Sequence, residues 1–329
     1  MYELPAPVRR IVVLRPNHRL GNTLLLTPLI QELEARFPDA EIELVGGGRA
    51  GRAVFQQFPQ VTTLHTFPAK SYANPGQVVK LLAALRERSY DLAIDPIPRS
   101  RSGRFLLALV RARVRIGYRW GVRIRDCMLT HAVDPALAPM HCAQSPLYLL
   151  RSALLPHARH ADPGFRTWPL ALRLTEAERR DGVQTLATVL GSATPPAEPP
   201  IGIYAHASGE KCMPAMWWRQ VVTILRTHVP TTPIVEFLPE DGRRRLASDI
   251  PSLYTRDLRL LGAALAATSA VVAADCGVMH LADAAGARVF GLFRTTEPSR
   301  YGPCGPDSEA LWVRNASADL MATQIRCAL

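Results

Sequence analysis

Short apolar runs alternate along this chain with longer segments in which apolar residues recur every three to four positions. The short runs, rich in β-branched residues, predict buried parallel strands, and the longer segments predict amphipathic helices. The expected strands cover residues 10–14, 41–45, 61–67, 90–95, 201–205, 234–238, 270–274, 289–293 and 311–313. The expected helices cover residues 20–38, 76–88, 141–155, 175–191, 217–228, 257–268, 278–286 and 317–329. Strands that alternate with helices in this way indicate an α/β fold built on parallel sheets.

The length of 329 residues predicts two domains of ordinary size. Residues 156–169 are rich in proline and histidine and have no apolar period, so the linker is expected near 160–170. We therefore expect an N-terminal domain over residues 1–165 and a C-terminal domain over residues 166–329. This division leaves the final helix, 317–329, free to pack back on the first domain.

The composition is that of a globular protein, with 48% apolar and 20% charged residues. The sequence contains no uncharged apolar stretch of the roughly 20 residues that a membrane-spanning helix needs. The apolar run near the N-terminus is too short for the core of a signal peptide, which predicts a cytoplasmic protein. Six cysteines without a Cys-x-x-Cys pair are expected to be reduced thiols rather than disulfides or zinc ligands.

The formal net charge of +11 is carried almost wholly by arginine, since the only lysines are Lys70, Lys80 and Lys211. Such basicity suggests an anionic partner: nucleic acid, phospholipid headgroups or a phosphorylated glycolipid. Arginines crowd residues 99–125, which form either a solvated helix face or a basic surface for acceptor phosphates. Aromatic interleaving and a recognition-helix pattern are both missing there, so nucleic acid is not expected as a partner.

The segment 270–306 concentrates the candidate chemistry. Its first strand ends at Asp275, Cys276 and Gly277, and a small-residue helix follows until Gly286. Ligands of open α/β sheets bind beyond the carboxyl ends of the strands. A glycine at a helix N-terminus, where backbone N–H groups are free, is suited to bind a phosphate. The segment therefore predicts a phosphate-binding turn after residue 275.

Several motifs resemble glycosyltransferase family 9, the heptosyltransferase family of lipopolysaccharide synthesis. They are D-x-G-x-M-H-x-A from residue 275, V-F-G-L-F from 289 and P-x-x-Y-G-P from 298. Residues 10–45, 89–118 and 201–218 also resemble this family. The resemblance implies a GT-B fold, with two Rossmann-like domains whose parallel sheets face each other across a cleft. It further implies inverting, metal-independent transfer of a heptose from an ADP-activated donor to a lipopolysaccharide-type phosphorylated glycolipid, without a cofactor. The acceptor suggests a position on the inner face of the inner membrane.

The resemblance also implies roles for individual residues. In the second domain Lys211, after Ser208, would meet the donor diphosphate, and Glu240 or its rival Asp241 would bind the ribose. The donor site would further include the turn and helix start of the 270–306 segment together with a threonine after the next strand: Asp275, Cys276, Gly277, Val278, Met279, His280 and Thr296. Asp275 would order the loop or bind sugar hydroxyls. For Met279 and His280 a place in the core is the alternative.

The first domain departs from the family at the expected catalytic base. Family members commonly carry Gly-Asp where this chain has Gly21 and Asn22, followed by Thr23. An amide cannot take a proton from the acceptor hydroxyl at neutral pH. Either His18 or Asp95 acts as the base instead, or Asn22 only positions a hydroxyl that needs little help.

The sequence leaves open two alternatives to an active sugar transferase. In one, the chain has lost transfer activity and serves as a binding or scaffolding subunit. In the other, it is a nucleotide-sugar 2-epimerase on the same fold, which would isomerise a donor without any acceptor.

Overall fold

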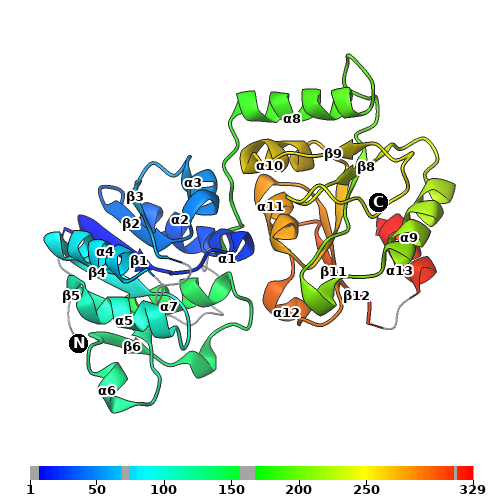
Figure 1. The fold of residues 1–329 in the computed structure, drawn as a ribbon. Coiled ribbons are helices and arrows are strands. Elements are labelled where there is room, and N and C mark those ends of the chain that lie inside the picture. The colour runs from blue at the N-terminus through cyan, green and yellow to red at the C-terminus, as the bar shows by residue number, and fades with distance from the viewer. Residues whose placement is uncertain (1–6, 69–73, 156–166, 315–316, 329) are drawn as a thin grey trace. The chain divides into compact units, whose positions relative to one another are not determined.

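The computed structural model describes residues 7–68, 74–155, 167–314 and 317–328 (Figure 1). The chain divides into two compact units, Met1–Trp168 and Pro169–Leu329. Each unit is a parallel sheet with helices on it, and its central strands consist almost entirely of buried residues. The predicted fold class, two Rossmann-like α/β domains with parallel sheets, is therefore confirmed.

The sheet of the first unit has the strand order β3-β2-β1-β4-β5-β6, and all of its paired strands are parallel. Its strands are β1 (Arg10–Leu14), β2 (Glu41–Gly46), β3 (Val61–Thr66), β4 (Ser89–Asp95), β5 (Arg111–Tyr118) and β6 (His131–Val133). Its helices are α1 (Leu20–Leu24), α2 (Thr27–Arg36), α3 (Gly48–Phe55), α4 (Pro75–Glu87), α5 (Arg101–Leu109), α6 (Arg123–Asp126), η2 (Pro135–Leu137) and α7 (Gln144–Leu154).

The second unit repeats this arrangement with the strand order β12-β11-β10-β7-β8-β9. Its strands are β7 (Ile201–Tyr204), β8 (Ile234–Phe237), β9 (Ser252–Leu253), β10 (Ala270–Ala274), β11 (Val289–Phe293) and β12 (Glu309–Trp312). Its helices are α8 (Glu176–Val189), η3 (Gly209–Lys211), α9 (Ala215–His228), α10 (Leu258–Ala266), α11 (Gly277–Ala285), α12 (Pro298–Tyr301) and α13 (Ala318–Ala328).

Both sheets reverse their direction of winding at one pair of neighbouring strands. In the first unit the chain moves outward from β1 in one direction and from β4 in the other. In the second unit β7 and β10 have the same relation. Loops that leave such a pair diverge to opposite faces and leave a crevice at the carboxyl ends, which is where open α/β sheets bind ligands. The topology therefore points to the loops after β1, β4, β7 and β10.

The expected helix over residues 20–38 is two helices, because Pro28 interrupts it. Proline has no N–H and cannot donate to the carbonyl oxygen four residues earlier, at Leu24. The Thr27 hydroxyl donates to that Leu24 oxygen instead, at 2.7 Å. The sequence pattern also does not predict α3, because the three glycines between β2 and the helix, Gly46, Gly47 and Gly48, are typical of a loop.

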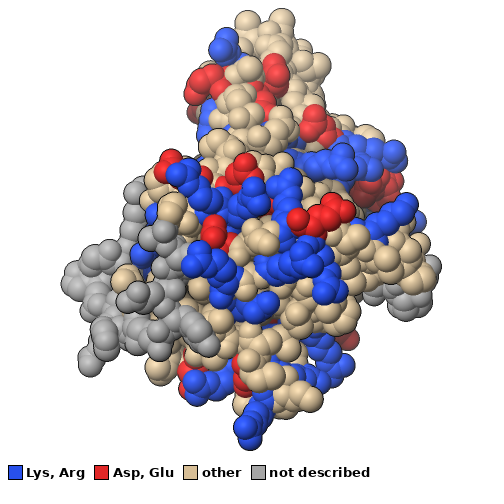
Figure 2. Space-filling view, turned by 90° about the vertical axis from the view of Figure 1, so that its left-hand side faces the viewer, with Lys and Arg blue, Asp and Glu red and all other residues tan. Residues whose placement is uncertain are grey.

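The arginine-rich segment 99–125 does not form one helix face, contrary to the first of the two interpretations. It runs through α5, along β5 and into α6, so its arginines are spread over three elements and the loops beside them. Arg104 on α5 is only 4% exposed, whereas Arg111 and Arg113 on β5 are exposed. Figure 2 shows a face of the molecule on which Lys and Arg cover more of the surface than Asp and Glu.

The final helix, α13, packs on α9 of its own unit. Met321 and Ile325 of α13 belong to the same buried cluster as Trp218, Val221 and Leu225 of α9. That this helix also packs back on the first domain stays a prediction. Its apolar stripe is already covered within the second unit.

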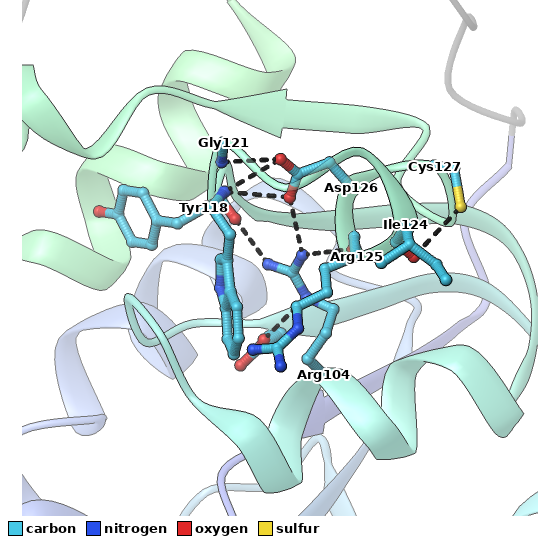
Figure 3. A network of polar contacts seen from close by, with 9 residues as sticks. Arg104, Tyr118, Gly121, Ile124, Arg125, Asp126 and Cys127 are labelled. Atoms are coloured by element: carbon cyan, nitrogen blue, oxygen red, sulfur yellow. Dashed lines mark hydrogen bonds and ion pairs between the residues drawn. The ribbon is translucent and has the colours of Figure 1, made fainter.

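Asp95, at the end of β4, lies at the centre of a buried polar network. Its carboxylate is 0% exposed and accepts a hydrogen bond from Arg104 Nε at 3.4 Å. The Arg104 guanidinium also donates to the backbone oxygens of Tyr118 at 2.6 Å and Arg125 at 2.9 Å, and it pairs with Asp126 at 3.3 Å (Figure 3). The network therefore joins β4, α5, the end of β5 and α6.

The prediction that Asp95 faces a substrate is wrong, because its side chain does not reach the surface. A Cβ on Gly103 of α5 would lie 2.4 Å from Asp95 Oδ1, so the glycine lets the helix close over the carboxylate. Burial raises the pKa of Asp95 from 3.8 to about 7, while Arg104 acts in the opposite direction. The carboxyl group is thus a structural part of the first unit.

This raised pKa predicts a pH dependence of stability. Between about pH 4 and pH 7 the unfolded chain has released the Asp95 proton while the folded chain still holds it, so the free energy of unfolding falls as the pH rises. We expect Asp95→Asn to lack this fall. The free energy of unfolding of the wild type should therefore decrease by roughly 2–4 kcal/mol relative to that of the variant across that range. Urea unfolding of both proteins at pH 4.5 to 8 measures the difference; parallel curves would contradict the assignment.

Candidate functional site

The loops after β7 and β10 meet at the winding reversal of the second sheet. Lys211, at the end of η3, places its Nζ 2.7 Å from Oδ2 of Asp275, the residue that follows β10. The two residues are 64 positions apart in the sequence, and they come together because β7 and β10 are neighbours in the sheet. The structure therefore brings together the two groups on which the sequence-based site depends.

Asp275 organises this edge of the sheet rather than facing solvent. It is 4% exposed, and the same Oδ2 that contacts Lys211 also accepts a hydrogen bond from the hydroxyl of Thr296, in the loop after β11. One carboxylate thus holds a lysine from one loop and a threonine from another. This agrees with the expected loop-ordering role of Asp275.

Lys211 remains accessible, with 31% of its side chain exposed. Its Nζ lies 5.9 Å from the centre of the Tyr301 ring on α12, within range of a cation–π contact. Because its carboxylate partner is buried and the ammonium reaches solvent, Lys211 presents a positive charge at the carboxyl edge of the sheet. Such a charge is suited to bind a diphosphate.

The first turn of α11 begins directly beside this ion pair. Cys276 is the residue before the helix and has extended backbone angles, and its side chain does not cap the helix N-terminus. The backbone N–H groups of the first turn, with the positive end of the helix dipole, favour an anion at this place. Burial raises the pKa of the Cys276 thiol to about 12, although the backbone N–H groups of Val278 and Met279 face its sulfur and act in the opposite direction, so the neutral thiol adds no negative charge next to them.

Two residues of the expected donor site are core residues. Met279 is 0% exposed, and its Sδ would lie 2.6 Å from a Cβ on Gly291 of β11. His280 is 4% exposed. Met279 thus packs against β11, in the core position that the sequence left open as its alternative, and a ligand contact of His280 stays a prediction. Gly277 is partly exposed and Val278 is 9% exposed, at the helix start.

The remaining expected donor-site residues lie in exposed loops. Ser208 precedes η3 and is exposed. Glu240 lies past β8, where its backbone oxygen accepts a hydrogen bond from the Tyr254 hydroxyl at 3.1 Å, and Asp241 lies 3.4 Å from Arg243. All three follow carboxyl ends of strands, on the same edge of the sheet as Lys211, and the ribose role of Glu240 or Asp241 stays a prediction.

Two residues near Lys211 were not predicted as part of the site. Arg294, after β11, donates to the backbone oxygens of Glu210 at 3.3 Å and Cys212 at 3.1 Å, so it fixes the turn that carries Lys211. Tyr301 lies beside the ammonium. Tyr301 belongs to the P-x-x-Y-G-P motif, so its position carried a signal in the sequence. The sequence alone could not show that Arg294 and Tyr301 reach the loop after β7.

In the first unit, the equivalent edge carries an amide pair. Asn22 on α1 donates from Nδ2 to Asn17 Oδ1 at 3.1 Å, and the same oxygen accepts from the backbone N–H of Arg19 at 2.8 Å. Gly21 and Asn22 are partly exposed, and His18 in the loop after β1 is exposed. The hydroxyl of buried Thr23 donates to the Arg19 oxygen at 3.3 Å. Asn22 therefore has a fixed orientation at the start of α1.

The described residues contain no group of three or more His, Cys, Asp or Glu side chains placed to hold a metal ion. Lys211 and the N-terminus of α11 are two positive groups at the edge of the second sheet.

The solved structures to which the chain is similar include several glycosyltransferases. The chain is similar to the E. coli ADP-heptose lipopolysaccharide heptosyltransferase II, with 18% identity, a TM-score of 0.75 and coverage of 97% of this chain and 98% of that one. It is similar to a family 9 glycosyl transferase of Veillonella parvula, with 17% identity, a TM-score of 0.75 and coverage of 99% and 97%. It is also similar to the E. coli heptosyltransferase WaaC with ADP-2-deoxy-2-fluoro heptose, with 16% identity, a TM-score of 0.69 and coverage of 96% and 98%.

These similarities show that both units together form a GT-B fold. No curated protein sequence matches the chain significantly. The model of glycosyltransferase family 9 (heptosyltransferase) matches residues 78–326, which is well over half of the chain. The matched region includes Lys211, the turn after β10 and the whole second sheet. The chain belongs to glycosyltransferase family 9, the heptosyltransferase family.

Proposed function

We propose that this glycosyltransferase moves a heptose or a related sugar from a nucleotide-diphosphate donor, ADP-heptose, to a lipopolysaccharide-type phosphorylated glycolipid, with inversion and without a metal. The first unit would bind the acceptor and the second the donor. The fold-level similarity to a heptosyltransferase solved with ADP-2-deoxy-2-fluoro heptose supports this choice of donor.

The observation that carries the proposal is the ion pair of Lys211 with Asp275 beside the first turn of α11. When the sugar leaves the donor, negative charge grows on the departing diphosphate. A fixed ammonium and a helix N-terminus can stabilise that charge in the transition state. In this mechanism Asp275 holds Lys211 in place, and Lys211 and the backbone at Gly277 and Val278 bind the diphosphate.

The acceptor side of the reaction depends on Asn22. Its amide is a hydrogen-bonding group and not a base, and its contact with Asn17 fixes its direction. Since Asp95 is buried, His18 is the only other base candidate from the sequence that reaches the surface. We propose that Asn22 orients the acceptor hydroxyl and that stabilisation of the leaving group supplies most of the rate enhancement.

Lys211→Ala tests the donor site. We expect a fall in kcat of about 100-fold or more in transfer from ADP-heptose, as for loss of one fixed group that stabilises transition-state charge. Lys80→Ala, at an exposed position on α4, is the matched control and should keep wild-type activity. Unchanged turnover in Lys211→Ala would contradict the assignment of Lys211 to the donor diphosphate. Isomerisation of the donor without any acceptor would favour an epimerase.

Asn22→Asp tests the role of the amide. If Asn22 orients the acceptor, the carboxylate variant loses activity, because it exchanges a donor of hydrogen bonds for an acceptor and separates from the Asn17 oxygen. We expect a loss of about 10-fold or more in kcat/KM for the acceptor. A large gain would instead mean that the natural chain is an impaired family member, and donor binding without transfer in both proteins would favour the scaffolding role.

A membrane-facing role for the first unit is supported by the segment around α6. Val122 and Ile124 are 45% and 77% exposed, and Arg119, Arg123 and Arg125 beside them are exposed as well. Asp126 holds this turn by accepting from the backbone N–H groups of Trp120 at 3.0 Å and Gly121 at 2.9 Å. Exposed apolar side chains among arginines are suited to an anionic lipid surface. Within the described ranges, no helix combines the length and hydropathy that a bilayer span requires.

Vesicle sedimentation tests this surface. We expect binding to vesicles that contain an anionic phospholipid and little binding to neutral ones, with about a five-fold loss of affinity in Arg123→Gln, as for one juxtamembrane charge. Arg180→Gln, on α8, provides a control that removes an equal charge elsewhere. Equal binding of both variants would contradict the role of α6.

A further inference from the structure

The first unit contains a pocket at the carboxyl ends of β1, β2 and β3. Its volume is about 360 Å³, part of which is open to solvent. It is lined by Thr23 of α1, by the Gly46–Gly48 turn and by Gly51 and Phe55 of α3. Thr23 is the neighbour of Asn22, so the pocket lies next to the proposed acceptor position.

The turn that forms one wall is fixed by close packing. A Cβ on Gly47 would lie 2.4 Å from the backbone oxygen of Asn17 and 2.7 Å from Cα of His18. The loop after β2 therefore packs directly against the loop after β1, which carries Asn17. Glycine at residue 47 is required for this contact, and the contact fixes the pocket relative to Asn22.

Gly51 has no such packing reason. It is buried in α3, yet a Cβ at this position would meet no atom within 4 Å. Glycine is unfavourable inside a helix compared with alanine, and a side chain here would fill a void without strain. The position therefore faces the open volume of the pocket, and glycine keeps that volume empty.

The lining is apolar with one cation. Leu26, Phe55 and Leu64 contribute hydrocarbon surface, Thr23 is largely buried, and Arg15, after β1, lines the pocket together with His65 and Thr66. Such a mixture is suited to a ligand that has an apolar body and an anionic end. A polar oligosaccharide alone would leave the apolar wall without a matching partner.

We propose that this pocket binds an apolar group of the acceptor, a short alkyl or aryl segment, with an acceptor phosphate at Arg15. This inference rests on the proposed function and adds a chemical class to it. The acceptor carries hydrocarbon and phosphate close to the hydroxyl that reacts beside Asn22.

Hexyl phosphate is the probe that matches the pocket, and inorganic phosphate and hexanol are its two halves. Calorimetric titration of the full chain should show that hexyl phosphate binds more tightly than either half. Gly51→Leu should weaken the binding of hexyl phosphate at least ten-fold, and Gly51→Ala should weaken it about three-fold. Gly76→Leu, at a helical glycine of the same unit that also has open space around its Cβ, should leave binding unchanged. Arg15→Gln should remove the preference for hexyl phosphate over hexanol.

Melting temperatures separate a filled pocket from a misfolded unit, since Gly51→Ala should fold at least as stably as the wild type. Equal binding of inorganic phosphate and hexyl phosphate, or unchanged binding in Gly51→Leu, would overturn the proposal. Donor binding is measured on the same variants with ADP-heptose. If the wild type and all variants bind ADP-heptose but none binds hexyl phosphate, this inference is wrong and the transferase proposal stands. If the wild type does not bind ADP-heptose, the transferase proposal is wrong instead.

Discussion

The contact on which the candidate site depends is the ion pair between Lys211 and Asp275. A buried carboxylate needs a partner, because an unpaired charge in a protein interior is costly. Asp275 obtains two, the ammonium after β7 and the Thr296 hydroxyl after β11, and it therefore joins three loops at one point. Since the lysine is only partly buried, the same contact that orders the loops also holds a positive charge where solvent and a ligand can reach it.

The two units have the same strand order, and they differ in the chemical groups that lie at the reversal of winding. The second unit places a cation and an uncapped helix start there, which favours an anion. The first unit places amides, a hydroxyl and a pocket with apolar walls there. In the proposed reaction the second unit stabilises the charge of the leaving group, and the first unit orients the acceptor.

The central parallel strands were predictable because they are short and apolar on both faces, whereas the arginine-rich β5 and the short strands β6 and β9 were not predicted. The sequence pattern missed the break before α2, although Pro28 indicates it. It missed α3 because three glycines precede a helix whose stability comes from packing. In the site, Lys211 and Asp275 were predicted as partners of one ligand from motifs alone. Met279 and Asp95 were not separable from ligand-binding residues by sequence, because burial is a property of what packs above a residue, here β11 and Gly103 of α5.

The burial of Asp95 and the amide at Asn22 together constrain the mechanism. With the carboxyl group at β4 closed off by Arg104 and α5, the acceptor edge of the first unit offers hydrogen bonds but no exposed carboxylate among the predicted base candidates. An acceptor hydroxyl oriented by Asn22 would then lose its proton late, as the bond to the sugar forms. Such a reaction depends more strongly on how well the departing diphosphate is stabilised, and in the proposed mechanism Lys211 and the first turn of α11 stabilise it.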